Sequence, residues 1–440
     1  MTLPPGVQAL GKVKYMLSST DSEKKPWRRH HPGYVWIAVL IVLSSLALTG
    51  AVSAATPITG PVTITVPGDY YLANNIIDSA VGIIIAVPNV VLDGKGKTLD
   101  GVDGTSSVGI RIYNVGMTLF NVVVKNVVVT DWGNGVFLTD VKTSQLEKVT
   151  VSSNTGNGIV TQNSIRNTIK TCTATNNGGV GILLYENSDS NTLTGNTVTA
   201  NTFEGMRIRY SSNNDILNNK LLNNTNAGIN MEGSSFNTVT GNTITGNKGD
   251  GLRVFESSGN IITKNTVKFN AQGIRVATDS IDNEITGNTV LNNSYNGVLL
   301  IDTSNNNMVV GNTFDMNSNS GIRIVRSGEN TVTGNYVRNN VQEGLYMWDT
   351  GTVSNVVVNN YFYNNKNAGV YTPIGSNKFN LPLSAQKSIT GFPSSGGNSW
   401  GQPNGQGFSQ ITPATNGICD TSYTLVTSNV DYLPLKWAKK

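Results

Sequence analysis

A glycine followed by an aliphatic residue or Met recurs along most of this chain, and no other feature restricts its fold as strongly. From Gly135 onward the spacing is 22 to 25 residues. A period of this size is typical of solenoids, in which each repeat is one supersecondary unit stacked on the next. The repeat is marked by Gly82, Gly109, Gly135, Gly158, Gly181, Gly205, Gly228, Gly251, Gly273, Gly297, Gly321, Gly344 and Gly369.

One repeat unit, residues 237–259, contains three short segments with inward aliphatic residues: Val239, then Ile244, then Leu252 and Val254. Strands this short cannot enclose a core alone, but stacked coils bury each aliphatic column and pair each strand in parallel with the next coil. A leucine-rich repeat has a similar period, but this unit is filled with Thr, Asn and β-branched residues instead of a Leu pattern. We therefore predict an all-β fold: a right-handed, single-stranded parallel β-helix of about 13 coils of roughly 23 residues, with three short sheets.

An asparagine series follows the same period. Asn tolerates the left-handed backbone conformation that tight corners need, and its side-chain amide can hydrogen-bond to the amide of the next coil. Cys172 falls on the same column, and we expect it and Cys419 to be unpaired small residues. We predict a structural Asn ladder at Asn196, Asn219, Asn242, Asn265, Asn288, Asn312 and Asn335.

The chain begins with a pattern that is typical of export. Four basic residues (Lys24, Lys25, Arg28 and Arg29) precede residues 34–55, which are apolar or small throughout. This pattern predicts a secretory signal peptide, and the run is also long enough to be an uncleaved membrane anchor with its basic side in the cytoplasm. We expect five parts: 1–33, the basic cytoplasmic region; 34–55, the signal or transmembrane helix; 56–108, the N-terminal cap and first coils; 109–372, the β-helix repeats; and 373–440, a C-terminal capping segment.

Charge and histidine content exclude several functions for the exported part. The formal net charge of +4 is carried by the N-terminal region, and the rest of the chain has equal numbers of acidic and basic residues. This balance gives no support to nucleic-acid binding. Both histidines, His30 and His31, precede the apolar run. A His general base, a Ser-His-Asp triad and a His-ligated metal are therefore excluded from the exported part.

Several segments resemble the NosD-type β-helix family. They are Gly68-Asp-Tyr-Tyr-Leu72, Leu92-Asp-Gly-Lys-Gly-Lys-Thr-Leu-Asp-Gly101, the repeated Asn-Thr-Val-Thr-Gly-Asn units and Gly397-Asn-Ser-Trp-Gly-Gln-Pro-Asn-Gly405. The resemblance implies a pectin-lyase-like β-helix, and relatives include carbohydrate-binding proteins, sugar hydrolases and archaeal surface proteins. The family label also implies copper, but the exported part has no His and its Met residues form no cluster. We expect no metal site and no cofactor.

One sheet carries the candidate functional residues. The second and fourth residues after each marker Gly point outward, because alternate residues of a strand face opposite sides. Aromatic rings stack on sugars and guanidinium groups bind carboxylates, so this face is predicted to bind an extended glycan, with an acidic glycan as one option. The predicted contacts are Arg207, Arg253, Arg275, Arg323, Tyr346 and Trp348, with the acidic neighbours Glu256, Asp302 and Asp349.

A structural interpretation of the same residues stays open. In it, the Arg side chains pair with nearby acids such as Glu204, Asp250 and Glu343. The outward aliphatic residues would then lie under a covering loop or an oligomer contact.

The sequence thus predicts an exported or cell-surface protein, secreted or anchored by one N-terminal membrane segment, that serves as a carbohydrate-binding or structural module of the cell envelope. Its expected partner is a glycan or envelope polysaccharide, together with the membrane if residues 34–55 remain uncleaved. The alternative is a polysaccharide-active enzyme, either a lyase or, with less support, a hydrolase or epimerase. A lyase would use Arg275 or Arg323 as its base, with Asp279, Asp302 and Glu256. Because these acids are spread one per coil, we favour the module over the enzyme.

Overall fold

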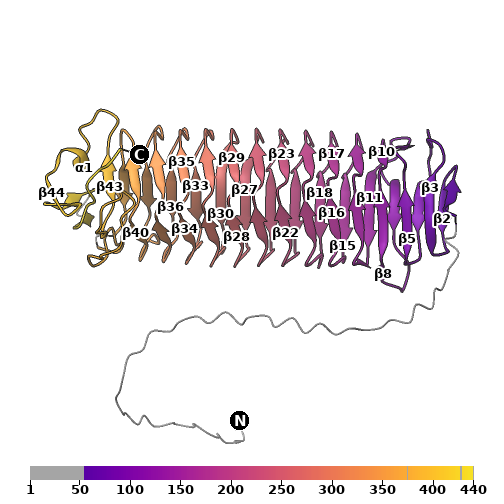
Figure 1. Cartoon of the computed structure of the whole chain (residues 1–440), viewed down its shortest axis with the longest axis horizontal. Helices are drawn as coiled ribbons and strands as arrows, with labels where there is room; N and C mark the ends of the chain where they lie inside the picture. The colour runs from indigo at the N-terminus through magenta and orange to yellow at the C-terminus, as the bar shows by residue number, and fades with distance from the viewer. Residues whose placement is uncertain (1–53, 374, 427–428, 440) are drawn as a thin grey trace, which may run out of the picture. The chain divides into compact units, whose positions relative to one another are not determined.

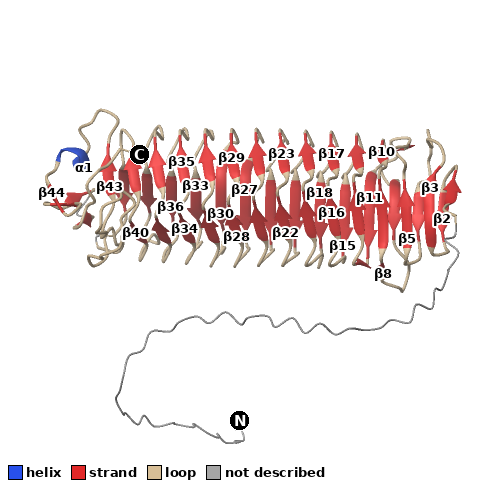
Figure 2. Ribbon diagram, viewed as in Figure 1, coloured by secondary structure: helices blue, strands red, loops and turns tan. Residues whose placement is uncertain are grey.

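The structure of this chain is a computed structural model that describes residues 54–373, 375–426 and 429–439. These residues form one elongated solenoid of stacked parallel strands (Figure 1). Almost all of it is strand and turn, and the one short helix lies at the C-terminal end (Figure 2). The predicted basic region and residues 34–53 of the predicted signal or anchor lie outside the described residues. Within the described ranges, no helix is both long and apolar enough to span a bilayer.

Sheet A contains 14 strands, and the strands that neighbour each other come from successive coils. Its strands are β1 (Thr56–Ile58), β3 (Gly68–Leu72), β5 (Val90–Asp93), β9 (Val122–Lys125), β13 (Gln145–Glu147), β16 (Thr168–Lys170), β19 (Thr192–Thr194), β22 (Asp215–Leu217), β25 (Thr238–Thr240), β28 (Ile261–Thr263), β31 (Glu284–Thr286), β34 (Met308–Val310), β37 (Thr331–Thr333) and β40 (Val356–Val358).

Sheet B also contains 14 strands, and the marker glycines lie in them or immediately before them. Its strands are β2 (Val62–Ile64), β4 (Ile83–Ile85), β7 (Val108–Ile112), β11 (Asn134–Thr139), β15 (Ile159–Gln162), β18 (Ile182–Tyr185), β21 (Met206–Arg209), β24 (Ile229–Glu232), β27 (Asp250–Phe255), β30 (Gln272–Ala277), β33 (Val298–Ile301), β36 (Ile322–Val325), β39 (Leu345–Trp348) and β42 (Ala368–Tyr371).

Sheet C contains 13 strands. They are β6 (Thr98–Asp100), β10 (Val128–Thr130), β14 (Thr150–Ser152), β17 (Thr173–Thr175), β20 (Thr197–Thr199), β23 (Lys220–Leu222), β26 (Thr243–Thr245), β29 (Thr266–Lys268), β32 (Thr289–Leu291), β35 (Thr313–Asp315), β38 (Tyr336–Arg338), β41 (Tyr361–Tyr363) and β43 (Ser399–Gly401). The remaining elements are the short parallel pair β8 (Leu119–Phe120) and β12 (Val141–Lys142), the antiparallel pairs β44 (Ala414–Thr415) with β45 (Ile418–Cys419) and β46 (Tyr423–Thr424) with β47 (Val430–Asp431), and helix α1 (Phe408–Ile411).

The predicted all-β, right-handed parallel β-helix of about 13 coils is confirmed, since each repeat contributes one strand to each sheet and all strand pairs within the three sheets are parallel. At about 4.8 Å between strands, the stack is on the order of 60 Å long. Both cysteines are buried and unpaired, as predicted.

The marker glycines are required by close approach between coils. A Cβ added at Gly228 would lie 2.4 Å from Cγ2 of Ile244 and 2.7 Å from the carbonyl oxygen of Gly251. Both separations are shorter than a carbon contact allows, so a side chain at this column would push two coils apart.

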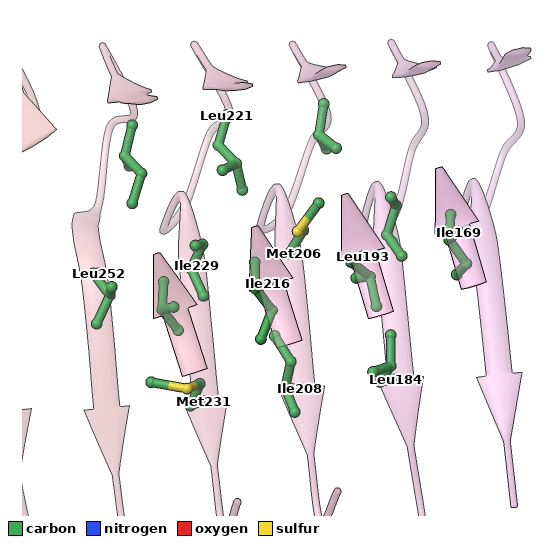
Figure 3. Close-up of a cluster of buried hydrophobic side chains, with 14 of the residues drawn as sticks. Ile169, Leu184, Leu193, Met206, Ile208, Ile216, Leu221, Ile229, Met231 and Leu252 are labelled. Carbon is green, nitrogen blue, oxygen red and sulfur yellow. The ribbon is translucent and has the colours of Figure 1, made fainter. Parts of the chain in front are cut away.

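The core is a set of aliphatic columns inside the coil. Leu193 and Ile216 enter from sheet A, Met206 and Ile229 from sheet B, and Leu221 from sheet C (Figure 3). All five are fully buried. Burying each such side chain contributes about 1.5–3 kcal/mol to folding, so successive coils stabilise one another mainly through these columns.

The ladder asparagines are buried and fully hydrogen-bonded. Oδ1 of Asn242 accepts from the backbone N–H of Asn219 at 2.8 Å and from its Nδ2 at 3.0 Å. Nδ2 of Asn242 then donates to the carbonyl oxygen of Ile216 at 2.8 Å and to Oδ1 of Asn265 at 3.0 Å. The left-handed conformation that we assigned to the ladder residues was wrong: it falls on the residue before each one, as in Gly241 with φ 69°. Each ladder Asn therefore stabilises the stack through the hydrogen bonds of its side chain, and the residue before it adopts the left-handed conformation of the corner.

The segment after β42 closes the C-terminal end of the solenoid. Strand β43 adds to sheet C, and the indole of Trp400 stacks on Phe362 with ring centroids 4.7 Å apart. The Asn ladder continues into this segment, because the backbone N–H of Asn360 donates to Oδ1 of Asn398 at 3.1 Å. Asp431 accepts from the backbone N–H of Asn398 at 2.8 Å and from Nε1 of Trp400 at 2.9 Å. The segment thereby supplies the last strand of sheet C and the last residue of the Asn ladder.

Candidate functional site

Five of the six predicted contact residues lie in a single row on the outward face of sheet B. Strand pairing places the row in the order Arg207, Asn230, Arg253, Arg275, Leu299, Arg323 and Tyr346. Trp348 lies in the neighbouring row, beside Val325. The structure therefore brings Arg253 next to Arg275 and Arg323 next to Tyr346, while Leu299 separates the two pairs.

The Arg side chains of this row make different contacts. The guanidinium of Arg323 lies over the ring of Tyr346, 4.2 Å from its centroid, and that of Arg253 lies 4.8 Å from the centroid of Phe255. Arg207 forms an ion pair with Glu232, and the same carboxylate lies 3.2 Å from Nε of Arg209. Cation–π contacts keep the guanidinium edges available for a ligand, whereas an ion pair compensates part of the charge.

The acids named in the structural interpretation are held mainly by other residues. Glu343 pairs with Lys366 at 2.9 Å, and Glu204 accepts from the side-chain amide of Asn230. Asp250 is partly buried; its burial raises its pKa, and the positive charges of Arg275 and Arg253 oppose this shift. Of these three acids, Asp250 has a pKa that the Arg residues of the row lower, while Arg207 pairs with Glu232, an acid that was not named from the sequence.

The three acidic neighbours predicted beside the row lie at the corner between sheets B and A. Glu256 and Asp302 have left-handed backbone conformations there, with φ 49° and 56°. Asp302 accepts from Nε of Arg326 at 2.9 Å, and Asp349 lies 3.7 Å from Nη1 of the same residue. Arg326, which the sequence analysis did not select, therefore neutralises two of these three acids.

An open groove lies on the N-terminal side of Arg207. It has a volume of about 310 Å³ and is lined by Asn157, Gly179, Val180, Leu183, Tyr185, Phe203, Arg207 and Arg209. The Phe203 side chain is half exposed (51%), and the guanidinium of Arg209 lies 5.8 Å from the Tyr185 ring centroid. The interaction of its hydroxyl with Glu186 raises the pKa of Tyr185. The groove thus combines aromatic and aliphatic surface with two cationic edges.

A smaller polar pocket lies on the other side of Arg207. It has a volume of about 170 Å³ and is lined by Glu204, Arg207, Asn230, Glu232, Arg253 and Phe255. Arg207 lines both cavities. The groove and the pocket therefore adjoin along four neighbouring strands of sheet B, β18, β21, β24 and β27.

We did not predict Tyr185, Phe203 and Arg209 as site residues from the sequence. Tyr185 and Arg209 occupy the outward fourth position after their glycines, which is a readable signal. Phe203 lies in the turn between Asn201 and Gly205, at a position where neighbouring repeats have Gly or Asn. Tyr295 is an equivalent aromatic residue in a later repeat and does not line the groove, so an aromatic residue in that turn does not identify the groove by itself.

Comparison with protein-family models gives two matches. The "Right handed beta helix region" model matches residues 108–266 and 185–314, which defines the class of protein. The model described as "Periplasmic copper-binding protein (NosD)" matches residues 282–405. Together the two matches span residues 108–405 and support the NosD-type right-handed β-helix family for that part of the chain.

Solved structures with similar chains include three with different functions in their descriptions. The periplasmic alginate epimerase AlgG is 16% identical, with 73% of this chain and 82% of that chain covered and a TM-score of 0.49. The surface adhesin PfbA of Streptococcus pneumoniae is 14% identical, with 66% and 84% covered and a TM-score of 0.48. The Dettilon tailspike protein is 18% identical, with 76% and 65% covered and a TM-score of 0.44. Among curated proteins, no match is found.

The residues of this chain do not fit the copper of the family description. The sequence has no His after His31. Burial raises the thiol pKa of Cys172 to about 12 and that of Cys419 to about 11, which disfavours the thiolate that copper binds. In the part of the chain that the structure describes, no three His, Cys, Asp or Glu side chains are grouped as a metal site requires. Met206 and Met231 are fully buried in the core and offer no ligand at the surface.

Proposed function

We propose that this chain is an exported glycan-binding module, and that the outward face of sheet B is its binding surface. The observation that carries the proposal is the groove between Tyr185, Phe203 and Arg209, which adjoins the polar pocket at Arg207. Sugar-binding sites combine an apolar surface for the ring C–H groups with polar groups that fix the hydroxyls.

The length of the row supports an extended ligand. From Arg207 to Tyr346 it spans seven strands of sheet B, and strands lie about 4.8 Å apart, so it is roughly 29 Å long. A glycan of several units matches this dimension better than a single small molecule. Arg253, Arg275 and Arg323 would then contact units beyond the groove.

Export is supported by two observations. Residues 34–55 have the pattern of a signal peptide or anchor, and the family description contains the word periplasmic. We therefore propose a location at the cell surface or outside the cytoplasm, with residues 34–55 as either a cleaved signal or a retained anchor.

The proposal is tested by applying the purified full-length chain to a glycan array. The proposal expects binding that the combined substitutions Arg253→Ala, Arg275→Ala and Trp348→Ala weaken. A matched control removes two cations and one aromatic ring from outside sheet B: Lys220→Ala, Lys268→Ala and Phe236→Ala. The proposal is wrong if no glycan binds, if the Arg253, Arg275 and Trp348 variant leaves binding unchanged, or if both triple variants weaken binding equally.

A polysaccharide-active enzyme is the second candidate, and two carboxylates, Glu204 and Glu232, line the pocket beside Arg207 and favour it. Two of the three acids we predicted for a lyase are otherwise engaged, since Asp302 pairs with Arg326 and Asp279 accepts from Thr303. Incubation with array-selected glycans separates the candidates. Unsaturated product would indicate a lyase, new reducing ends without unsaturation a hydrolase, and intact glycan a binding module.

A further inference from the structure

Two buried side chains in the polar pocket each have an oxygen without a hydrogen-bond donor. Glu204 is 4% exposed and Asn230 is 5% exposed. Oε1 of Glu204 accepts from Nδ2 of Asn226 at 3.2 Å and from Nδ2 of Asn230 at 3.3 Å. Oε2 of Glu204 and Oδ1 of Asn230 have no partner within the described residues. Buried polar atoms are normally paired, so these two oxygens indicate a ligand or water that donates to them.

The same pocket also contains donors without acceptors. Nε of Arg207 and Nε of Arg253 are buried and have no hydrogen-bond partner among the residues described. Strand pairing places Asn230 directly between these two Arg residues in the outward row. The pocket lining therefore combines two buried, unpaired acceptor oxygens with two buried, unpaired N–H donors, and Asn230 lies one strand away from each Arg.

The charges of the lining restrict what can enter. Arg207 and Arg253 are opposed by Glu204 and Glu232, and Arg207 is already paired with Glu232. A metal cation would meet two guanidinium groups, and a ligand carboxylate would meet the unpartnered Oε2 of Glu204. A hydroxyl group avoids both conflicts, because it donates to an oxygen and accepts from an N–H at once.

We propose that this pocket recognises an uncharged sugar unit through two neighbouring hydroxyl groups. One hydroxyl donates to Oε2 of Glu204 and the other to Oδ1 of Asn230, and the Nε groups of Arg207 and Arg253 donate back to them. The ring of Phe255 offers an apolar edge to the C–H face of the same unit. The inference rests on the proposed glycan binding and makes it specific: at this position the glycan is neutral, in contrast to the acidic glycan considered from the sequence.

The test uses the full-length chain and a panel of neutral hexose oligosaccharides with their uronic-acid counterparts. Glu204→Gln retains the shape but places an amide donor where the free oxygen was, provided that Asn226 and Asn230 still donate to the other atom. We expect the Kd for the neutral ligand to rise by about tenfold or more. Glu343→Gln is the matched control, because Glu343 occupies the same position before its marker Gly, is also buried, and lies outside the pocket. It should leave the Kd unchanged.

A second variant distinguishes a loss of ligand contacts from a loss of folding. Arg253→Gln changes a partly exposed residue on the outward face and should also weaken the neutral ligand by about tenfold. Binding of uronic-acid ligands alone, or an unchanged Kd in both Glu204→Gln and Arg253→Gln, overturns the inference while leaving glycan binding by sheet B intact. Absence of binding to every glycan instead contradicts the proposed function itself, so the two failures are distinguishable.

Discussion

Replacing one ladder asparagine, Asn265→Ala, should destabilise the solenoid more than any single surface change. Nδ2 of Asn265 donates to the carbonyl oxygen of Val239 at 2.8 Å and to Oδ1 of Asn288 at 3.0 Å. Its Oδ1 accepts from the backbone N–H of Asn242 at 2.9 Å and from Nδ2 of Asn242 at 3.0 Å. Alanine removes all four bonds and leaves a buried N–H of Asn242 without an acceptor.

The magnitude follows from these contacts. Each hydrogen bond contributes about 1 kcal/mol net, so the loss is about 4 kcal/mol, and a buried orphan donor adds to it. Thr240→Ala is the control, because Thr240 lies on the outer face of sheet A in a neighbouring coil, and it should cost less than about 0.5 kcal/mol. Urea denaturation measures both changes in the free energy of unfolding. Hydrogen exchange should show lost protection first at Asn242 and its neighbours, since each repeat is stabilised by the adjacent ones. A loss below about 1 kcal/mol for Asn265→Ala would refute the view that the ladder is a main source of stability.

Three further predictions concern other parts of the solenoid. Gly228→Ala should lower the free energy of unfolding by about 1–3 kcal/mol, measured by denaturation, because its Cβ would lie 2.4 Å from Ile244; an unchanged midpoint would contradict this close packing. Burial raises the pKa of Asp431 to about 7, above its ordinary value of 3.8, so the folded state holds its proton more tightly and the C-terminal cap should lose stability as pH rises from about 4 to about 7. Thermal unfolding across that range should show this fall in the native chain and not in Asp431→Asn, and a rise with pH would contradict it. Arg326→Ala should cost less than about 1 kcal/mol and leave glycan binding unchanged, since its ion pairs with Asp302 and Asp349 are partly exposed; a large loss of binding would place the corner acids in the site.

The fold was predictable because the same physical constraints act in every coil. A buried aliphatic residue, a ladder Asn and a Gly without room for a Cβ recur with each turn, so the period in the sequence is the period of the structure. The outward row from Arg207 to Tyr346 was predictable for the same reason, through strand alternation.

The contacts of the candidate site were less predictable, because they depend on turn conformation and on pairing between coils. Phe203 reaches the groove from a turn, and Glu204 is held by amide groups of the following coil instead of an Arg. The ladder also continues to Asn398 after the period has stopped, since tertiary packing brings β43 onto β41 across an irregular segment. A sequence repeat predicts which face of a strand is exposed. It does not predict which hydrogen-bond or ion-pair partners a side chain has on that face.

The most direct measurement of the central claim is hydrogen exchange of the full-length chain with and without an array-selected glycan. Bound glycan is predicted to protect the turn around Phe203 and strands β18, β21, β24 and β27 of sheet B. Protection should extend to β30 and β36 where further units contact Arg275 and Arg323, and the strands of sheets A and C in the same coils should stay unchanged. Protection confined to sheets A or C, or to the C-terminal segment after β42, would contradict the assignment of glycan binding to sheet B.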